Sequence, residues 1–146
     1  MTLPIDPAQL DEDDIGVKRT TLEMSHDEAI EHVREVFTDA GFGIPTEFSP
    51  SELLNEKVDA DRDPYYVLGA CNPAVANRAL DASENRMGGL FPCNVVIWAE
   101  EPGVQTVYHV SIMRIARLVG MAPDDDAMAD IIADTGELAD EAFEAL

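Results

Sequence analysis

The chain has 146 residues, 46% of them hydrophobic, and this length fits one domain with a core of its own. Thirty Asp and Glu residues against nine Lys and Arg residues give a formal net charge of -21 at pH 7. Such a surface repels phosphate backbones and anionic lipid headgroups, so we expect no nucleic-acid partner and no membrane partner.

The acidic residues run from Asp6 to Glu144 and do not form a single tail. Their mutual repulsion opposes folding in dilute buffer, and concentrated salt screens it because the Debye length falls to about 3 Å at 1 M. We therefore expect a salt-adapted, halophilic protein. An acidic protein from an organism that lives at low salt is the alternative.

The start of the chain and its two cysteines bear on cellular location. Residues 1–6 have no basic region and no apolar run of signal-peptide length, and no later stretch reaches the roughly 20 apolar residues of a membrane span. Two cysteines are too few for a disulfide scaffold. We therefore expect Cys71 and Cys93 to be free thiols in a reducing cytoplasm.

The first third of the chain predicts a leader, two strands and a helix. Residues 1–14 are charged and show no periodicity, so we expect a flexible acidic leader followed by a single α/β domain over residues 15–146. Alternation predicts a strand over residues 16–23, and a second short strand follows at 43–48. Between them, Ser25 and Glu28 form a capping box that starts a helix.

The rest of the chain adds strands and helices in turn. Ser49 starts a short helix, and the apolar run over residues 65–71 predicts a central strand. The remaining predictions are a helix from Pro73, a hairpin of strands 95–98 and 105–112, a helix over 113–119 and a last helix from Pro123. Together they indicate an α+β fold, a two-layer α/β sandwich with helices packed on a mixed or largely antiparallel sheet of about five strands.

Cys71 stands where the predicted central strand gives way to a helix. Amides at a helix N-terminus carry partial positive charge, which favours a thiolate, and ligands gather at the carboxyl ends of strands in sheets flanked by helices. Asn72 is the expected N-cap and Pro73 the first residue of that helix. A small buried thiol with only a packing role is the alternative for Cys71.

Cys93 lies between Pro92 and Asn94, directly before the second buried strand. Because asparagine follows both cysteines, a thiol beside an amide recurs at two junctions, and this pairing can present a nucleophile or a ligand beside a hydrogen-bonding group. The chain has no zinc, phosphate-loop or dinucleotide-binding pattern, so the sequence indicates no metal site and no particular cofactor. The candidate ligand-binding residues are Cys71, Asn72, Pro73, Pro92, Cys93 and Asn94.

A family resemblance rests on residues 66–73, on Pro92-Cys93-Asn94-Val95, and on the helix end at residues 40–43. These stretches resemble the family called domain of unknown function 302, and the similarity covers about Gly16 to the C-terminus. The resemblance implies a small α/β fold that forms homodimers, and it implies no particular reaction. After the hairpin, relatives often carry an Asp-Pro pair where this chain has Ile112-Met113-Arg114.

These observations support three hypotheses about function. The leading one is a homodimeric binding or sensing domain in which Cys71 and Cys93 line a partly apolar pocket for a small ligand, a metal ion or an oxidant. One alternative is an enzyme with Cys71 as nucleophile and His109 as its base, because His26 and His32 lie on a remote helix. The other is a purely structural interaction domain with no pocket between the cysteines.

Overall fold

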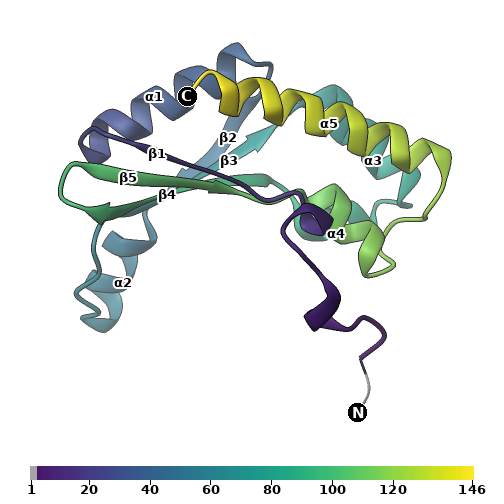
Figure 1. Cartoon of the computed structure of the whole chain (residues 1–146), viewed down its shortest axis with the longest axis horizontal. Helices are drawn as coiled ribbons and strands as arrows, with labels where there is room; N and C mark the ends of the chain where they lie inside the picture. The colour runs from purple at the N-terminus through teal and green to yellow at the C-terminus, as the bar shows by residue number, and fades with distance from the viewer. Residues whose placement is uncertain (1–2) are drawn as a thin grey trace.

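The computed structural model describes residues 3–146, in which five strands form one sheet with helices packed on it (Figure 1). The strand order is β1-β5-β4-β3-β2, and every neighbouring pair is antiparallel. This arrangement confirms the predicted two-layer α/β sandwich. The strands are β1 (Lys18–Leu22), β2 (Gly43–Phe48), β3 (Tyr65–Cys71), β4 (Cys93–Glu101) and β5 (Val104–His109).

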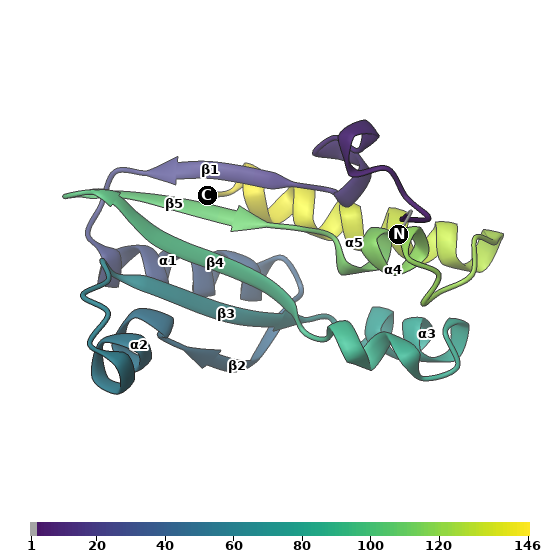
Figure 2. The ribbon, with the colours of Figure 1, turned by 90° about the horizontal axis from the view of Figure 1, so that it is seen from below.

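Helices cover one face of the sheet, lie beyond one of its ends and flank its β2 edge (Figure 1 and Figure 2). Figure 2 shows α1 and α5 behind the strands, α2 beside β2, and α3 and α4 beyond one end of the sheet. None of the helices in residues 3–146 is long and apolar enough to span a membrane. The helices are α1 (His26–Asp39), α2 (Pro50–Val58), α3 (Pro73–Ala82), α4 (Ile112–Leu118) and α5 (Asp126–Glu144), and the 3-10 helices are η1 (Pro7–Gln9), η2 (Asp13–Ile15) and η3 (Arg86–Leu90).

The residues at the two ends of helix α1 determine where it begins and where it ends. The Ser25 hydroxyl accepts a hydrogen bond from the Glu28 amide at 3.2 Å, which satisfies one of the amides left free at a helix start. The helix ends before Gly41, whose φ of 109° is a conformation that side chains with a Cβ rarely adopt. Its buried face consists of Ala29, Ile30, Val33 and Phe37.

Two hydrophobic clusters make up the core. The first lies between α1 and the sheet, where Phe37 packs with Leu68 and Ile97. The second joins α3, α4 and the first half of α5, and it includes Met113 and Met128. Leu138 of α5 packs against both clusters, so the 19-residue helix α5 ties the two halves of the molecule together.

The face of the sheet opposite α1 carries an aromatic row. The Tyr65 and Trp98 rings stack with centroids 5.9 Å apart, and Tyr108 lies 5.9 Å beyond Trp98. The Arg19 guanidinium lies 5.4 Å from the Tyr108 ring centroid and 5.7 Å from that of Trp98. Among the elements described, no helix lies in front of β4 and β5 on this face (Figure 2).

The end of β5 differs from the prediction. The strand stops at His109 rather than at Ile112, because the Ser111 hydroxyl accepts a hydrogen bond from the Arg114 amide at 3.2 Å and caps α4. The prediction that Ser111 continues the strand was therefore wrong. A serine three residues before an amide at a helix start is an N-cap signal that the alternating pattern concealed.

The predicted leader contains structure within the described residues, which start at residue 3. Asp11 and Asp14 cap each other, since the amide of each donates to the carboxylate of the other at 2.9 and 3.1 Å. The Ser111 amide donates to the Ile15 carbonyl at 2.8 Å, and this bond joins η2 to the start of α4. The elements η1 and η2 were not expected, and the flexibility of residues 1–14 stays a prediction.

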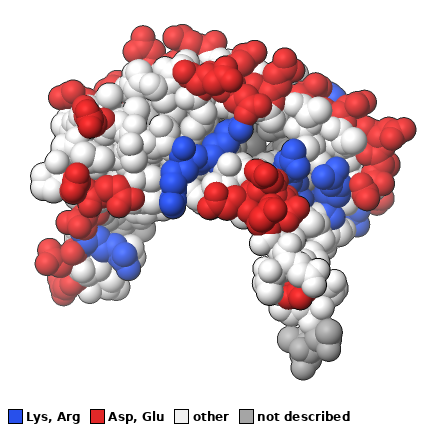
Figure 3. Space-filling view, in the orientation of Figure 1, with Lys and Arg blue, Asp and Glu red and all other residues white. Residues whose placement is uncertain are grey.

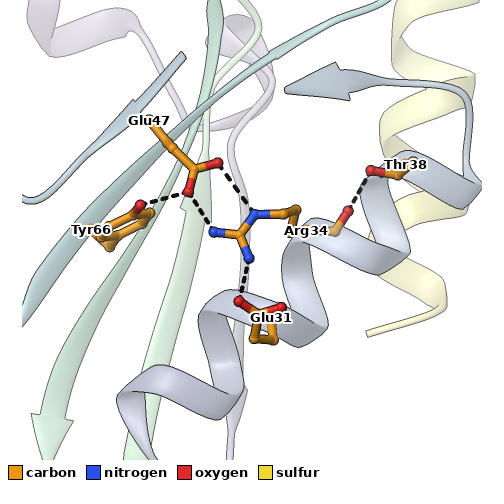
Figure 4. A network of polar contacts seen from close by, with 5 residues as sticks. All are labelled: Glu31, Arg34, Thr38, Glu47 and Tyr66. Atoms are coloured by element: carbon orange, nitrogen blue, oxygen red, sulfur yellow. Dashed lines mark hydrogen bonds and ion pairs between the residues drawn. The ribbon is translucent and has the colours of Figure 1, made fainter. Parts of the chain in front are cut away.

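A polar network fastens α1 to the β2 edge of the sheet (Figure 4). The Arg34 guanidinium donates two hydrogen bonds to the Glu47 carboxylate, and it donates a third to Glu31 at 2.6 Å. Tyr66 donates its hydroxyl to Glu47 at 2.7 Å. The hydrogen bonds from Arg34, and then from Tyr66, lower the pKa of Glu47 below its ordinary value. Glu47 is thus held as a carboxylate by two elements at once.

Replacing Glu47 tests this network. Glu47→Gln should lower the free energy of unfolding by about 1 kcal/mol at pH 7, a modest value because the Arg34 and Glu47 side chains are 28% and 31% exposed. Because the pKa of Glu47 is lowered in the fold, its contribution is fully present above the ordinary pKa of 4.5 and is lost as the pH falls through the folded-state pKa. Denaturant titrations at several pH values measure both effects.

Glu35→Gln is the matched control for Glu47→Gln. Glu35 lies on the exposed face of α1 and makes no ion pair among the residues described. This substitution removes the same negative charge without breaking a contact. Equal stability changes in the two variants would show that the network contributes nothing.

Candidate functional site

The pairing of β3 with β4 brings the two cysteine motifs to one end of the sheet. Ala70 lies opposite Cys93 in the antiparallel register, so Cys71 is displaced from Cys93 by one residue along the chain. Side chains alternate along a strand, so Cys71 leaves β3 on the other face from Cys93, and the two thiols share a pocket only because β3 ends at Cys71. A disulfide needs Cβ atoms that approach each other, and both cysteines are free thiols.

A pocket of about 200 Å³ lies at this end of the sheet, and both thiols line it. We call it the thiol pocket. It lies at the seam between the two hydrophobic clusters, since Phe42 and Ala70 belong to the first and Val75 and Met113 to the second. Its lining is Phe42, Pro45, Thr46, Ala70, Cys71, Asn72, Val75, Ala76, Phe91, Pro92, Cys93, Met113 and Thr135.

Asn72 holds the Cys71 end of the pocket in place. Its side-chain oxygen accepts a hydrogen bond from the Val75 amide at 3.0 Å, which caps α3 as predicted. Its side-chain nitrogen donates to the Gly41 carbonyl at 3.0 Å, so the loop after α1 is tied to the same residue. One asparagine thus fixes the strand-to-helix junction that carries Cys71.

The Pro92 side of the pocket depends on a glycine. A Cβ added at Gly69 would lie 2.4 Å from the Thr46 hydroxyl oxygen and 2.6 Å from the Pro92 Cγ atom. Only glycine therefore permits β2 and the segment before β4 to close over β3 at this point. The Phe91–Pro92 peptide bond is cis.

The two thiols differ in exposure and acidity. Cys93 is only 8% exposed, and burial, followed by the charge of an ionised Cys71, raises the pKa of its thiol to about 12. Cys93 therefore stays a protonated thiol at neutral pH. Cys71 is partly exposed at the rim of the pocket. Of the two, Cys71 is the thiol that a soluble reagent can reach.

Two of the predicted site residues lie outside the pocket. Pro73 is the exposed first residue of α3 and does not line it. The Asn94 side chain is exposed, and only the backbone of this residue takes part, through a carbonyl that accepts from His109. The structure thus brings Cys71, Asn72, Pro92 and Cys93 together.

His109 does not reach Cys71. It lies opposite Val95 on β4, and Val95 lies opposite Leu68 on β3. Cys71 is therefore two strands away and three residues farther along, roughly 10 Å in each direction. Alternation places the two side chains on opposite faces as well. A base must lie within hydrogen-bond reach of its nucleophile, so the pairing of Cys71 with His109 is not supported.

The helical half of the pocket was missed by the sequence analysis. Met113 comes from α4 and Thr135 from α5, both far from the cysteine motifs along the chain. Thr135 gave a signal, because it is a polar residue at helical spacing from Ile131 on the apolar face of α5. Nothing local indicated that this face meets the end of β4.

The donor atoms at the site do not form a metal centre. Among residues 3–146, no group of three or more His, Cys, Asp or Glu side chains is placed to hold a metal ion. The polar groups of the thiol pocket are the two thiols, an amide and the hydroxyls of Thr46 and Thr135. The Thr135 hydroxyl already donates to the Ile131 carbonyl at 2.7 Å. The pocket is therefore an apolar cavity with few polar groups.

Thiol labelling tests the difference between the two cysteines. With Ellman's reagent at pH 8, one thiol per folded chain should react rapidly, and Cys71→Ser should abolish that reaction while Cys93→Ser keeps it. Cys93 should not react until the chain unfolds, because with a pKa of about 12 only about one part in ten thousand is thiolate at pH 8. Rapid reaction of the folded Cys71→Ser variant would contradict the assignment.

Comparison with known proteins places the chain in a family. The family model described as "Domain of unknown function DUF302" matches residues 18–146. A crystal structure of an uncharacterized conserved protein DUF302 from Bacillus stearothermophilus has 26% sequence identity and a TM-score of 0.74, covering 88% of this chain and 96% of that one. No curated protein matches. The chain belongs to the DUF302 family.

Proposed function

We propose that this chain is a binding or sensing domain that takes a small apolar molecule into the thiol pocket. The observation that carries the proposal is a cavity of about 200 Å³ with a mostly apolar lining, one buried thiol and one accessible thiol. Ligand sites in proteins are concave, mainly apolar and furnished with a few polar groups. Apolar contacts supply the binding affinity, and the polar groups of Cys71 and Asn72 orient the ligand in the pocket.

The composition of the pocket favours an organic ligand over a metal ion. Thiols bind soft metals as thiolates, and the raised pKa of Cys93 keeps that sulfur protonated. Cys71 remains as a single accessible thiol. It gives the domain a position at which an oxidant or an electrophilic ligand would react first, so occupancy of the pocket and the state of Cys71 are linked.

The other two hypotheses have less support. An enzyme with Cys71 as nucleophile cannot use His109 as its base, since the strand register places His109 two strands away and three residues farther along. A purely structural domain was expected to have no pocket between the cysteines, and the thiol pocket counts against it. Binding therefore remains the function that the geometry favours.

We propose in addition that the protein is a homodimer. The support is the uncovered aromatic row on the sheet, where Tyr65, Trp98 and Tyr108 are each partly exposed. Aromatic side chains are enriched at the centres of protein interfaces, and a second copy would bring the same self-complementary surface. A single-chain mass for the native protein at working concentration would contradict this proposal.

We propose further that the protein is adapted to high salt and that it works in a reducing cytoplasm. The charge distribution supports the first point and the free cysteines support the second. Figure 3 shows acidic side chains along the outer rim formed by α1 and α5, with basic side chains below this rim and in the region of α2. Repulsion among 30 carboxylates is relieved when salt screens it. The free state of both cysteines is consistent with a reducing compartment.

Filling the thiol pocket tests the proposed binding function. Fluorobenzene, a small neutral probe, should bind the native chain in a ¹⁹F NMR titration. Ala76→Trp should weaken that binding by roughly tenfold or more, because Ala76 lines the pocket and the indole would occupy it. Ala74→Trp is the control, since Ala74 is exposed on the same helix and does not line the pocket. Equal binding in the two variants, or no binding to the native chain, would refute the proposal.

Thermal unfolding in salt tests the adaptation. The midpoint should rise by about 10 °C or more between dilute buffer and molar KCl, because screening removes the self-repulsion of a chain with net charge -21. Differential scanning calorimetry measures the midpoint. An unchanged midpoint would contradict the proposed adaptation to high salt.

A further inference from the structure

A second pocket, of about 240 Å³, lies beneath α5 on the other side of Cys93. We call it the α4–α5 pocket. It shares only Cys93 and Thr135 with the thiol pocket. Figure 3 shows a hollow below the acidic rim with basic side chains on both sides of it. Its charged and polar lining residues are Asp13, Lys18, His109, Ser111, Arg114, Thr135 and Asp140.

His109 is the buried polar group of this pocket. It is 4% exposed, and its Nδ1 atom lies 2.9 Å from the Asn94 carbonyl oxygen. A carbonyl only accepts, so Nδ1 carries the hydrogen and Nε2 is the atom that gains or loses a proton. Within residues 3–146, every fully buried side-chain nitrogen or oxygen has a hydrogen-bond partner. His109 Nε2 has no such partner, so this atom is not fully buried. Nε2 therefore faces the open space of the pocket.

The groups around His109 keep its imidazole neutral. Burial lowers the pKa of His109, the hydrogen bond to the Asn94 carbonyl opposes this, and the charge of Lys18 lowers it further. At neutral pH, Nε2 thus presents a lone pair that can accept a hydrogen bond. The groups that share the pocket with it are Asp13 of η2, Lys18 of β1, Cys93 of β4, Arg114 of α4 and Asp140 of α5.

Arg114 is the cation of this pocket that lacks an acidic partner. Lys18 contacts Asp140, whereas Arg114 makes no ion pair with any described residue, in a chain with 30 acidic residues. Its aliphatic stem passes close to Gly16, because a Cβ at Gly16 would lie 3.2 Å from the Arg114 Cδ atom and 2.7 Å from the Ser111 Cβ atom. Gly16 has a φ of 64° and permits this close approach.

We propose that the α4–α5 pocket binds a small oxyanion that also carries a hydroxyl group, such as hydrogenphosphate or a hydroxycarboxylate. The guanidinium of Arg114 presents the planar fork that recognises an oxyanion, whereas the charge of Lys18 is already offset by Asp140. The lone pair of His109 Nε2 accepts the hydrogen bond of the ligand hydroxyl. Ser111, whose oxygen accepts from the Arg114 amide, keeps its own hydroxyl hydrogen for the ligand.

The carboxylates of the pocket do not oppose this assignment. Asp140 is engaged by Lys18, and Asp13 is exposed to solvent, where salt screens its charge. An oxyanion would therefore meet an unpaired guanidinium and a shielded carboxylate. The two pockets share Cys93 and Thr135, but neither Arg114 nor Lys18 lines the thiol pocket, so the charged groups of this site are separate from it.

NMR titration of the isotope-labelled full chain at constant ionic strength in KCl tests the proposal. Glycolate and inorganic phosphate should both shift the His109 imidazole signals, and acetate, which lacks the hydroxyl, should bind several-fold more weakly than glycolate. A response to glycolate alone would assign hydroxycarboxylates, and a response to phosphate alone would assign phosphates. No saturable shift with either probe would overturn the proposal.

Two variants on one helix locate the binding. Arg114→Gln should weaken the binding of the responding probe by roughly tenfold or more, and Arg114→Lys should retain part of it because the charge remains. Arg117→Gln is the control, since Arg117 lies on α4 outside the pocket. Unchanged affinity in a folded Arg114→Gln variant would overturn the assignment. Ala76→Trp should leave oxyanion binding intact, so the proposal for each pocket is tested separately.

Discussion

β3 and β4 pair along six consecutive positions, from Tyr65 opposite Trp98 to Ala70 opposite Cys93, and this register brings the two cysteine motifs together at the thiol pocket. Side chains of strands change face with every residue, so a slip by one position would move Cys93 to the outer face. The same slip would remove Val95 and Ile97 from the core, where both are fully buried. The core therefore protects the register that the site needs.

The thiol pocket follows from how the core is divided. One cluster lies between the sheet and α1. The other lies among α3, α4 and α5, beyond the end of the strands. Helix α5 contacts both clusters through Leu138. Protein interiors are close-packed, so space that remains at such a seam is a feature of the arrangement rather than of one residue. The α4–α5 pocket lies along the same seam, on the far side of Cys93.

Local signals in the sequence predicted elements well and contacts poorly. The bounds of β3 and the start of α3 followed from an apolar run that ends at Cys71 and from an asparagine and a proline that start a helix. The Ser25 and Ser49 caps were likewise confirmed. In each case the residues that decide the structure are close together in the sequence, within seven residues for β3 and within four for the caps. Such short-range chemistry can be read without knowing the fold.

The site itself depends on residues far apart in the sequence. The proximity of Cys71 to Cys93 requires the β3–β4 register, and the roles of Met113 and Thr135 require the packing of α4 and α5. His109 was placed on the correct strand, but its partner is the Asn94 carbonyl rather than a cysteine. The unpaired state of Arg114 could not be predicted, because it depends on which of 30 acidic side chains come near.

The chain combines an acidic exterior with two sheltered pockets of different character. The exterior exposes acidic side chains to the solvent. The thiol pocket is apolar, and the α4–α5 pocket contains a neutral imidazole and an unpaired guanidinium. The proposed adaptation to salt rests on the exterior, and the proposed ligand binding rests on the two pockets.

Native mass spectrometry of the protein purified from its source tests this account most directly, since it reports assembly, ligand and thiol state together. The account predicts a mass of two chains plus bound small molecules, with Cys71 and Cys93 reduced. A bare single chain with no bound small molecule would contradict it.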